Sequence, residues 1–226
     1  MADRAAKDHL FEQFARVGKA LASPKRLELL DVLAQGERTV EALARATDLR
    51  VTTCSAHLQT LKHARLVTTR KVGTRVHYRL AGDDVAALWA RLQRVAAEHV
   101  ADLAAARAAY LGPEDTEAVD REELLRRAAT GEVTVVDVRP AEEHAAGHIP
   151  GALSVPLDRL ADRLADLPPD TEVVAYCRGA YCVLAHDATR LLTRHGRRAR
   201  RLADGLLEWR LAGLPIATGD DAGAVA

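Results

Sequence analysis

The sequence predicts two domains: a mainly α domain, followed by an α/β domain whose parallel sheet has flanking helices. The length of 226 residues exceeds that of one typical domain. Apolar residues recur at helical spacing through most of residues 1–111, whereas short apolar strands alternate with helical patterns over 116–217. The joint between them contains Gly112 and Pro113, which end a helix. We expect residues 218–226 to form a frayed tail.

The net charge of zero conceals an asymmetry between the two halves. Residues 1–111 hold 18 basic against 12 acidic side chains, and residues 112–226 hold 14 against 20. A basic half predicts a polyanionic partner. No apolar stretch is long enough for a membrane span, and the N-terminus lacks the apolar region of a signal peptide. Three cysteines cannot form a paired framework, so we expect a cytoplasmic chain.

The first half predicts a winged helix-turn-helix from the order of its elements. Helical patterns cover 11–21, 23–33 and a short segment from Thr39, and a turn at Thr47 and Asp48 leads into a helix over 51–64. The period then changes to two at 67–72 and 75–80, around Gly73 and Thr74, which predicts a β-hairpin. A last helix is expected over 84–110. Helix, turn, helix and hairpin in this order are typical of DNA-binding domains.

The charge of this segment favours double-stranded DNA as the partner. Residues 37–80 hold nine basic against three acidic side chains, although a run of charge can also be a solvated face. On the 51–64 helix we expect Val51, Cys54, Leu58 and Leu61 to form an apolar stripe. The opposite face and the hairpin supply the candidate DNA-binding residues, which are Arg50, Thr52, Thr53, Ser55, Ala56 and Gln59, with Arg70, Lys71 and Arg75.

The first half resembles the ArsR family of bacterial repressors. The resemblance covers about residues 9–108 and rests on ASPKRLELL at 22–30, TVEALA at 39–44, CSAHLQTL at 54–61, ARLV at 64–67 and GTRVHY at 73–78. It implies a homodimer built from the first and last helices. Metal-sensing relatives place cysteines at 40–45, where there are none here, or Asp and His on the last helix. His99 and Asp102 match only half of that second pattern, so we expect no metal site and no cofactor.

The second half alternates strands and helices. Strands are expected at 133–138, 153–155, 173–176 and 199–202, with helices at 120–129, 157–166, 183–195 and 206–212. Such alternation predicts a parallel sheet covered by helices. The sequence VVAYCRGAYCVL at 173–184 places Cys177 between a strand and a helix. Because free N–H groups at a helix start favour an anion and Arg178 adds positive charge, we expect a lowered pKa and a reactive Cys177. An inert buried cysteine is the alternative, and it is the interpretation we adopt for Cys54.

The second half resembles the rhodanese family over about residues 116–217. The resemblance rests on VDVRPAEEHAAGHIPGA at 136–152, on the loop from Cys177 to Cys182, and on DGLLEWRLAGLP at 204–215. It implies a rhodanese-like fold in which Cys177 accepts a sulfane sulfur as a persulfide and passes it on, so that a small sulfane-sulfur donor or acceptor is a partner. The candidate catalytic residues are Cys177, Arg178 and Cys182, and the backbone amides of a loop formed with Gly179, Ala180, Tyr181 and Val183 would hold the persulfide.

Three details of this half limit its chemistry. We expect Asp137, Arg139 and Glu143 to form structural ion pairs, and His148 to pack or hydrogen bond, because a metal site with His144 would lack a third donor. Related phosphatases need an Arg six residues after the cysteine, where this chain has Val183. Cys182 also departs from the basic or hydroxyl residue that many active sulfurtransferases carry there.

Two functions remain open from the sequence. The first is a transcriptional regulator whose second domain senses or processes reactive sulfur. The second is primarily a sulfurtransferase that uses the first domain for dimerisation or targeting. The complete DNA-binding layout and the basic first half favour the first.

Overall fold

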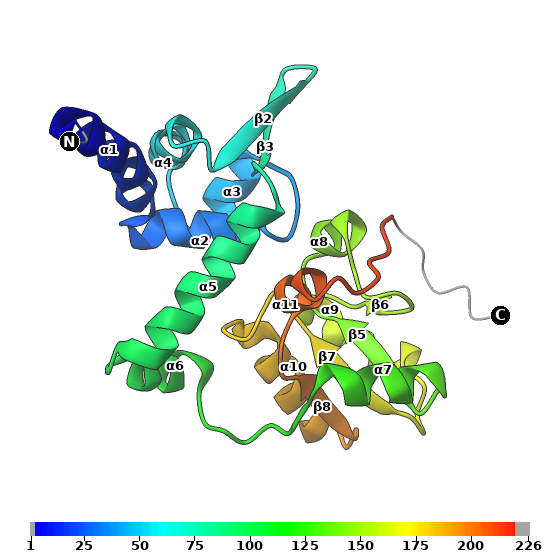
Figure 1. Ribbon diagram of the computed structural model, residues 1–226. Coiled ribbons are helices and arrows are strands. Elements are labelled where there is room, and N and C mark those ends of the chain that lie inside the picture. The colour runs from blue at the N-terminus through cyan, green and yellow to red at the C-terminus, as the bar shows by residue number, and fades with distance from the viewer. Residues whose placement is uncertain (1–2, 220–226) are drawn as a thin grey trace. The chain divides into compact units, whose positions relative to one another are not determined.

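The computed structural model describes residues 3–219, and the contacts between residues divide the chain into two compact units, Met1–Arg91 and Leu92–Ala226 (Figure 1). Of the tail expected over 218–226, residues 220–226 lie outside the described residues. Each unit is described by itself below.

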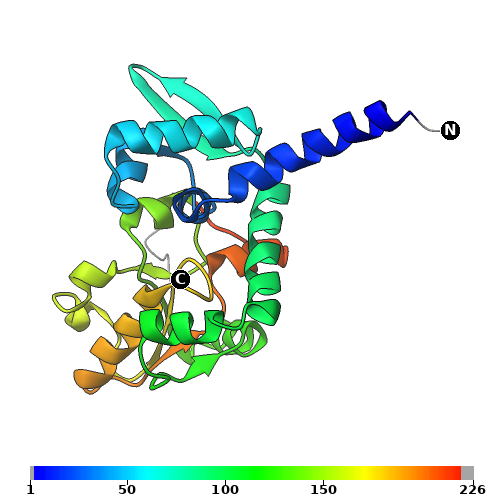
Figure 2. The ribbon, with the colours of Figure 1, turned by 90° about the vertical axis from the view of Figure 1, so that its left-hand side faces the viewer.

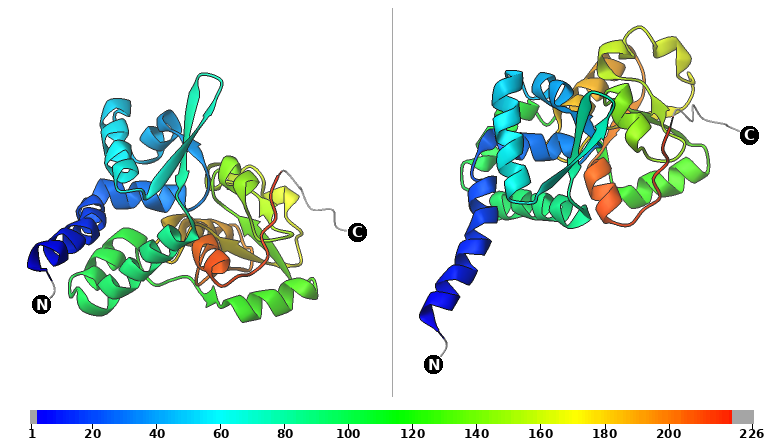
Figure 3. Two further views of the ribbon diagram at one scale, coloured as in Figure 1. Left: turned by 45° about the horizontal axis from the view of Figure 1, so that its top comes forward. Right: turned by 90° about the horizontal axis from the view of Figure 1, so that it is seen from above.

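The first unit is a winged helix-turn-helix, as predicted. Its elements are α1 (Arg4–Leu21), α2 (Pro24–Leu33), β1 (Arg38–Thr39), α3 (Val40–Ala46), α4 (Val51–His63), β2 (Val67–Val72), β3 (Arg75–Leu80) and the start of α5 (Asp83–His99). The three strands form an antiparallel sheet in the order β1-β3-β2. The hairpin β2–β3 projects beyond the helices of this unit (Figure 3).

Local sequence explains where these elements begin and turn. Pro24 occupies the first turn of α2, where its missing N–H is not needed. The Thr39 hydroxyl accepts a hydrogen bond of 3.3 Å from the amide of Ala42, which caps α3. Gly73 has a φ of 59° at the first central position of the hairpin turn, a conformation that glycine adopts without strain.

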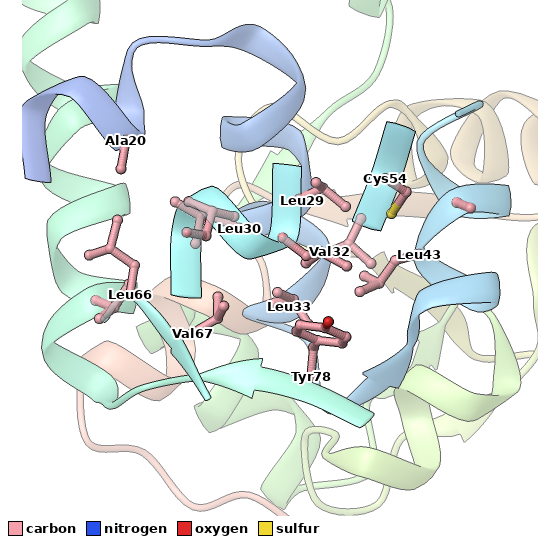
Figure 4. Close-up of a cluster of buried hydrophobic side chains, with 14 residues drawn as sticks. Ala20, Leu29, Leu30, Val32, Leu33, Leu43, Cys54, Leu66, Val67 and Tyr78 are labelled. Carbon is pink, nitrogen blue, oxygen red and sulfur yellow. The ribbon is translucent and has the colours of Figure 1, made fainter. Parts of the chain in front are cut away.

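One buried cluster holds the first unit together (Figure 4). Leu29, Leu43, Cys54, Leu58 and Leu61 each have 0% exposure in it, which supports the inert packing expected for Cys54. Burial raises the pKa of the Cys54 thiol to about 11, which keeps it protonated. The prediction for Val51 is wrong: its side chain is 46% exposed because it stands at the first residue of α4, beyond the edge of the core.

The second unit holds the predicted parallel sheet. Its elements are the end of α5, α6 (Leu103–Leu111), β4 (Ala118–Val119), α7 (Arg121–Ala129), β5 (Val133–Asp137), α8 (Ala141–Ala146), β6 (Leu153–Ser154), α9 (Leu157–Leu160), the 3₁₀ turn η1 (Leu164–Asp166), β7 (Glu172–Tyr176), α10 (Val183–Arg194), β8 (Ala199–Leu202) and α11 (Leu206–Leu211). The strand order is β4-β8-β7-β5-β6, with parallel pairing throughout. The helix expected over 84–110 is two helices, since α5 ends at His99 and α6 begins at Leu103.

Helices cover both faces of this sheet, and alternate residues of each strand point to opposite faces. On one face Val174 and Tyr176 of β7 pack with Leu124 of α7 and Trp209 of α11. On the other face Val173, Ala175 and Cys177 pack with side chains of α9 and α10, namely Leu160, Ala185, Ala188 and Leu192. Cys177 therefore continues the α10-facing side of the central strand.

Candidate functional site

The exposed face of α4 carries most of the expected base-reading residues. Thr52, Thr53, Ala56 and Gln59 are exposed, Ser55 is half-buried, and the exposed Arg50 is the N-cap residue of α4. The Gln59 amide Nε2 donates a hydrogen bond of 3.2 Å to the Tyr78 hydroxyl of β3. This bond joins the α4 face to the hairpin, which the sequence did not indicate.

The hairpin presents its basic side chains unequally. Lys71 and Arg75 are exposed on either side of the turn. Arg70 instead donates two hydrogen bonds to the Glu37 carboxylate, from Nε at 3.3 Å and from a terminal nitrogen at 2.5 Å. This contact lowers the pKa of Glu37. The charge of Arg70 is therefore partly neutralised, whereas Lys71 and Arg75 are available to phosphate groups.

In the second unit, the loop 177–182 runs from the end of β7 to the start of α10. Cys177 is 2% exposed, and its thiol donates a hydrogen bond of 3.3 Å to the carbonyl oxygen of Cys182. Cys182 is the N-cap residue of α10. A cysteine thus stands at each end of the loop that leads into α10. Gly179, Ala180, Tyr181 and Val183 between and beside them are all half-buried.

The pKa shifts of the two loop thiols differ from the lowered pKa that was expected for Cys177. Burial raises the pKa of Cys177 well above its ordinary value, and the hydrogen bond with the Cys182 side chain raises it further. The same hydrogen bond, with the backbone amides of Arg178 and Leu184, lowers the pKa of Cys182. The expectation of a lowered pKa for Cys177 is therefore wrong for the sulfur-free loop, in which the thiolate is favoured on Cys182 at the helix N-terminus.

Arg178 does not supply its charge to Cys177 alone, because it has a carboxylate partner. Its Nε and a terminal nitrogen donate to both oxygens of Glu143, at 2.7 to 3.2 Å. Glu143 lies on α8 and its side chain is 1% exposed. A buried carboxylate needs such a partner, so this ion pair ties the loop to α8.

Sequence reasoning missed Glu208 and Gly205, which hold the loop from behind. The Glu208 carboxylate accepts hydrogen bonds from the amides of Gly205 at 3.0 Å and Ala180 at 3.5 Å, and burial raises its pKa. A Cβ on Gly205 would lie 2.6 Å from the carbonyl carbon of Arg178. Both residues stand in the motif at 204–215, but only the fold shows that this segment contacts the loop.

The remaining polar residues near the loop are structural, as expected. Arg139 pairs with Asp137 at 2.5 Å, both side chains being 0% exposed, and the Tyr176 hydroxyl donates to Asp137 at 2.7 Å. The rings of His144 and His148 stack with centroids 3.6 Å apart, and each has a ring nitrogen within 3.2 Å of a backbone carbonyl oxygen.

Within residues 3–219, no helix is long and apolar enough to cross a membrane.

Comparisons with known proteins assign both units. A helix-turn-helix domain model matches residues 21–70 and a rhodanese-like domain model matches residues 120–212. The HTH-type transcriptional regulator Rv0324 of Mycobacterium tuberculosis is 60% identical over 96% of both chains. A sulfurtransferase of Allochromatium vinosum is 37% identical over 43% of this chain and 92% of its own.

A solved structure adds a relative of the first unit. The homodimeric winged helix-turn-helix DNA-binding domain of a possible ArsR-family regulator from Mycobacterium bovis, fragment 1–100, is 57% identical. The match covers 44% of this chain and 90% of that chain, with a TM-score of 0.41. From the full-length relative and the two domain matches, this chain belongs to the ArsR-type helix-turn-helix transcriptional regulators that carry a rhodanese-like domain.

Proposed function

We propose that this regulator couples reactive sulfur to transcription through a persulfide on Cys177. The observation that carries the proposal is the pair of cysteines before and at the N-cap of α10, where the Cys177 thiol donates a hydrogen bond to the carbonyl oxygen of Cys182 and the two side chains shift each other's pKa. A regulator needs no second domain to bind DNA. A domain that places two interacting thiols at one helix start gives it a site where sulfur chemistry changes local charge.

The first step makes the persulfide. The Cys177 thiolate attacks the outer sulfur of a sulfane donor such as thiosulfate, a new S–S bond forms, and the donor's S–S bond breaks. Sulfite leaves with the electron pair, and the enzyme-bound product is a persulfide anion. The proton of the Cys177 thiol passes first to the Cys182 thiolate, its hydrogen-bonded neighbour.

The second step uses Cys182. Cys182 passes the proton that it received to the outer sulfur of the persulfide, and its thiolate then attacks the inner sulfur, which gives a Cys177–Cys182 disulfide and releases the outer sulfur as hydrosulfide. The two cysteines are oxidised by two electrons and the sulfane sulfur is reduced. If a second sulfane donor first converts Cys182 to a persulfide, the persulfide anion of Cys177 attacks its inner sulfur, which gives a trisulfide bridge and releases the outer sulfur of Cys182 as hydrosulfide. Either bridge closes the loop 177–182 and replaces an anion at the start of α10 with a neutral group.

DNA binding is proposed to use the exposed α4 face and the hairpin of a homodimer in the cytoplasm. Leu10, Phe11 and Phe14 of α1 are 50%, 58% and 61% exposed, and this helix extends away from the rest of its unit (Figure 2). Such a run of apolar side chains is covered in a dimer built from the first and last helices. The M. bovis relative is a homodimer. A reducing compartment keeps Cys177 and Cys182 available as thiols.

Two assays on the full chain separate this proposal from a plain sulfurtransferase. A gel-shift titration uses DNA from upstream of the chain's own gene, and a thiosulfate:cyanide assay measures turnover. We expect sequence-specific DNA binding that responds to sulfane donors, with slow turnover. Fast turnover by a protein whose DNA affinity ignores the donor would identify the enzyme hypothesis as the correct one.

A further inference from the structure

Arg178 is a poor source of positive charge for an anionic sulfur on Cys177, because its guanidinium bonds both oxygens of buried Glu143. The strand register identifies a second candidate. β7 and β8 are parallel neighbours in which Ala175 is the partner of Arg201. Ala199, two residues before Arg201, packs in the same cluster as Ala175 and Cys177. Because alternate residues share a face, Arg201 lies on the α10-facing side, beside the end of β7.

The immediate partners of Arg201 are uncharged. Its Nε donates a hydrogen bond of 3.3 Å to the Thr116 hydroxyl, which lies 3.3 Å from Nδ1 of His186 on α10. Since Arg201 can only donate, the Thr116 hydroxyl oxygen accepts from it and also shares a hydrogen bond with Nδ1 of His186. Burial, followed by the charges of Arg201, Arg190 and Arg107, lowers the pKa of His186 to about 4, so this histidine is neutral.

Arg201 also has a second cation nearby. Arg107 is an exposed residue of α6, a helix that packs against α10 within the second unit. Burial, followed by the charge of Arg107, lowers the pKa of Arg201, whereas the negative charge of Cys177 and that of Glu114 raise it. Neighbouring Arg190 is already paired with Asp115 and Asp187. Among residues 3–219, no carboxylate forms an ion pair with Arg201 or Arg107, so an anion here meets unneutralised positive charge.

We propose that Arg201, supported by Arg107, is the positioning residue that stabilises the thiolate and the persulfide anion of Cys177. The inference rests on the proposed sulfur chemistry of that cysteine and adds the charge that it needs. The titratable groups around the loop are Cys182, which bonds Cys177, Arg201 on β8, on which the charge of Cys177 acts, Arg178 with its partner Glu143, and Glu208, which accepts from the amide of Ala180. Of these, Arg201 is the cation without a carboxylate partner among the described residues.

Because Arg107 lies on α6, a charge on Cys177 also affects how that helix packs. A negative charge on Cys177 reduces the repulsion between Arg201 and Arg107, so it strengthens the packing of α6 on α10. α6 follows α5 in the sequence, and α5 begins at Asp83 in the first unit. α6 is therefore the element of the second unit on which the charge of the loop bears.

Alkylation of Cys177 by iodoacetamide between pH 6 and pH 9 tests the inference, because the rate follows the thiolate fraction. Trypsin cleaves after Arg178, so peptides 164–178 and 179–190 report Cys177 and Cys182 separately by mass spectrometry. We expect Arg201→Gln to slow labelling of Cys177 about three- to tenfold at each pH. Arg201→Lys restores most of the rate because it keeps the charge.

Arg200→Gln is the matched control, since Arg200 is the adjacent residue on β8, points to the other face and pairs with Glu123 and Glu172. It should label as wild type does. Arg107 is exposed, so Arg107→Gln leaves the core intact and is expected to slow labelling about twofold. Wild-type rates in both Arg201→Gln and Arg107→Gln overturn the proposal, as does an Arg201→Lys protein as slow as Arg201→Gln. Should Arg201→Gln not fold, the Arg107→Gln rate decides alone.

The same peptides distinguish this inference from the proposed function. After treatment with polysulfide, a gain of one sulfur on peptide 164–178 reports the persulfide, whereas the labelling rates report the thiolate. A charge effect of Arg201 without any sulfur gain refutes the persulfide and retains the role of Arg201. If peptide 164–178 gains sulfur but neither Arg201→Gln nor Arg107→Gln changes the labelling rate, the role of Arg201 is refuted and the persulfide is retained.

Discussion

The thiol of Cys177 donates a hydrogen bond to the carbonyl oxygen of Cys182, 3.3 Å away, so two cysteines occupy the two ends of one short loop. Cys177 ends the central strand of the sheet and Cys182 is the N-cap residue of α10. A separate hydrogen bond between the two side chains raises the pKa of Cys177 and lowers that of Cys182. The two thiols that we propose as nucleophile and resolving group therefore lie at the two ends of this loop.

This contact predicts different fates for the three cysteines under a sulfane donor. We expect peptide 164–178, which contains Cys177, to gain about 32 Da, and Cys177→Ser to abolish the gain. Cys54→Ser should not change it, because Cys54 is fully buried in the first unit. In Cys182→Ser the persulfide should persist, since the resolving thiol is missing. Sulfur that remains bound to Cys177→Ser, or a persulfide that decays equally fast without Cys182, contradicts this assignment.

The Arg70–Glu37 ion pair predicts that the hairpin residues contribute unequally to DNA binding. Lys71→Ala and Arg75→Ala each remove an exposed charge and should lower the slope of log affinity against log salt by about 0.9. Glu37→Gln should raise the slope by about the same amount, because it releases Arg70 to contact a phosphate. Gln59→Ala should instead relax preference at one base position. Fluorescence anisotropy over a range of salt concentrations measures each slope; an unchanged slope for Glu37→Gln would show that Arg70 does not reach DNA.

Gly205 stands at a position in the second unit that has no room for a side chain. In Gly205→Ala the added methyl group meets the backbone of Arg178, so the loop 177–182 must move or the fold must lose stability. We expect a loss of about 1–3 kcal/mol in the free energy of unfolding, together with slower sulfur uptake by Cys177. Gly213→Ala is a useful comparison, since a Cβ there meets no atom within 4 Å, although its φ of 72° adds local strain. Chemical denaturation measures both; equal sulfur uptake by Gly205→Ala and wild type contradicts the packing argument.

His186 predicts how stability depends on pH. Its pKa is about 4 in the folded chain, whereas an exposed histidine titrates near pH 6.5. The unfolded state therefore binds more protons between these values, and stability falls as the pH decreases from about 6.5 to about 4. The loss is on the order of 1–3 kcal/mol. His186→Gln should flatten this part of the stability curve, as measured by urea denaturation at several pH values. A curve of wild-type shape in His186→Gln would assign the acid sensitivity to other groups.

Sequence reasoning predicted the order of the elements and the place of Cys177 because hydrophobic periodicity and the loop motif are local patterns. It could not predict β4 or α8, which are short and stabilised mainly by their neighbours. The contacts that set the charge around the thiols lie beyond local patterns as well. Arg178 pairs with Glu143, 35 residues away, and Arg201 reaches the loop only through strand pairing. The hydrogen bonds at the helix start lower the pKa of Cys182, whereas burial acts more strongly on Cys177 and raises its pKa.

We propose that sulfur on Cys177 changes DNA binding by the same chain, and the affinity of the chain for DNA decides the matter. DNA affinity of the full-length protein is measured by anisotropy before and after polysulfide treatment, in wild type and in Cys177→Ser. We expect at least a fivefold change in wild type, within the usual range of coupling between two sites, and none in Cys177→Ser. The same affinity in treated and untreated wild type, with the persulfide confirmed by mass, would contradict the account.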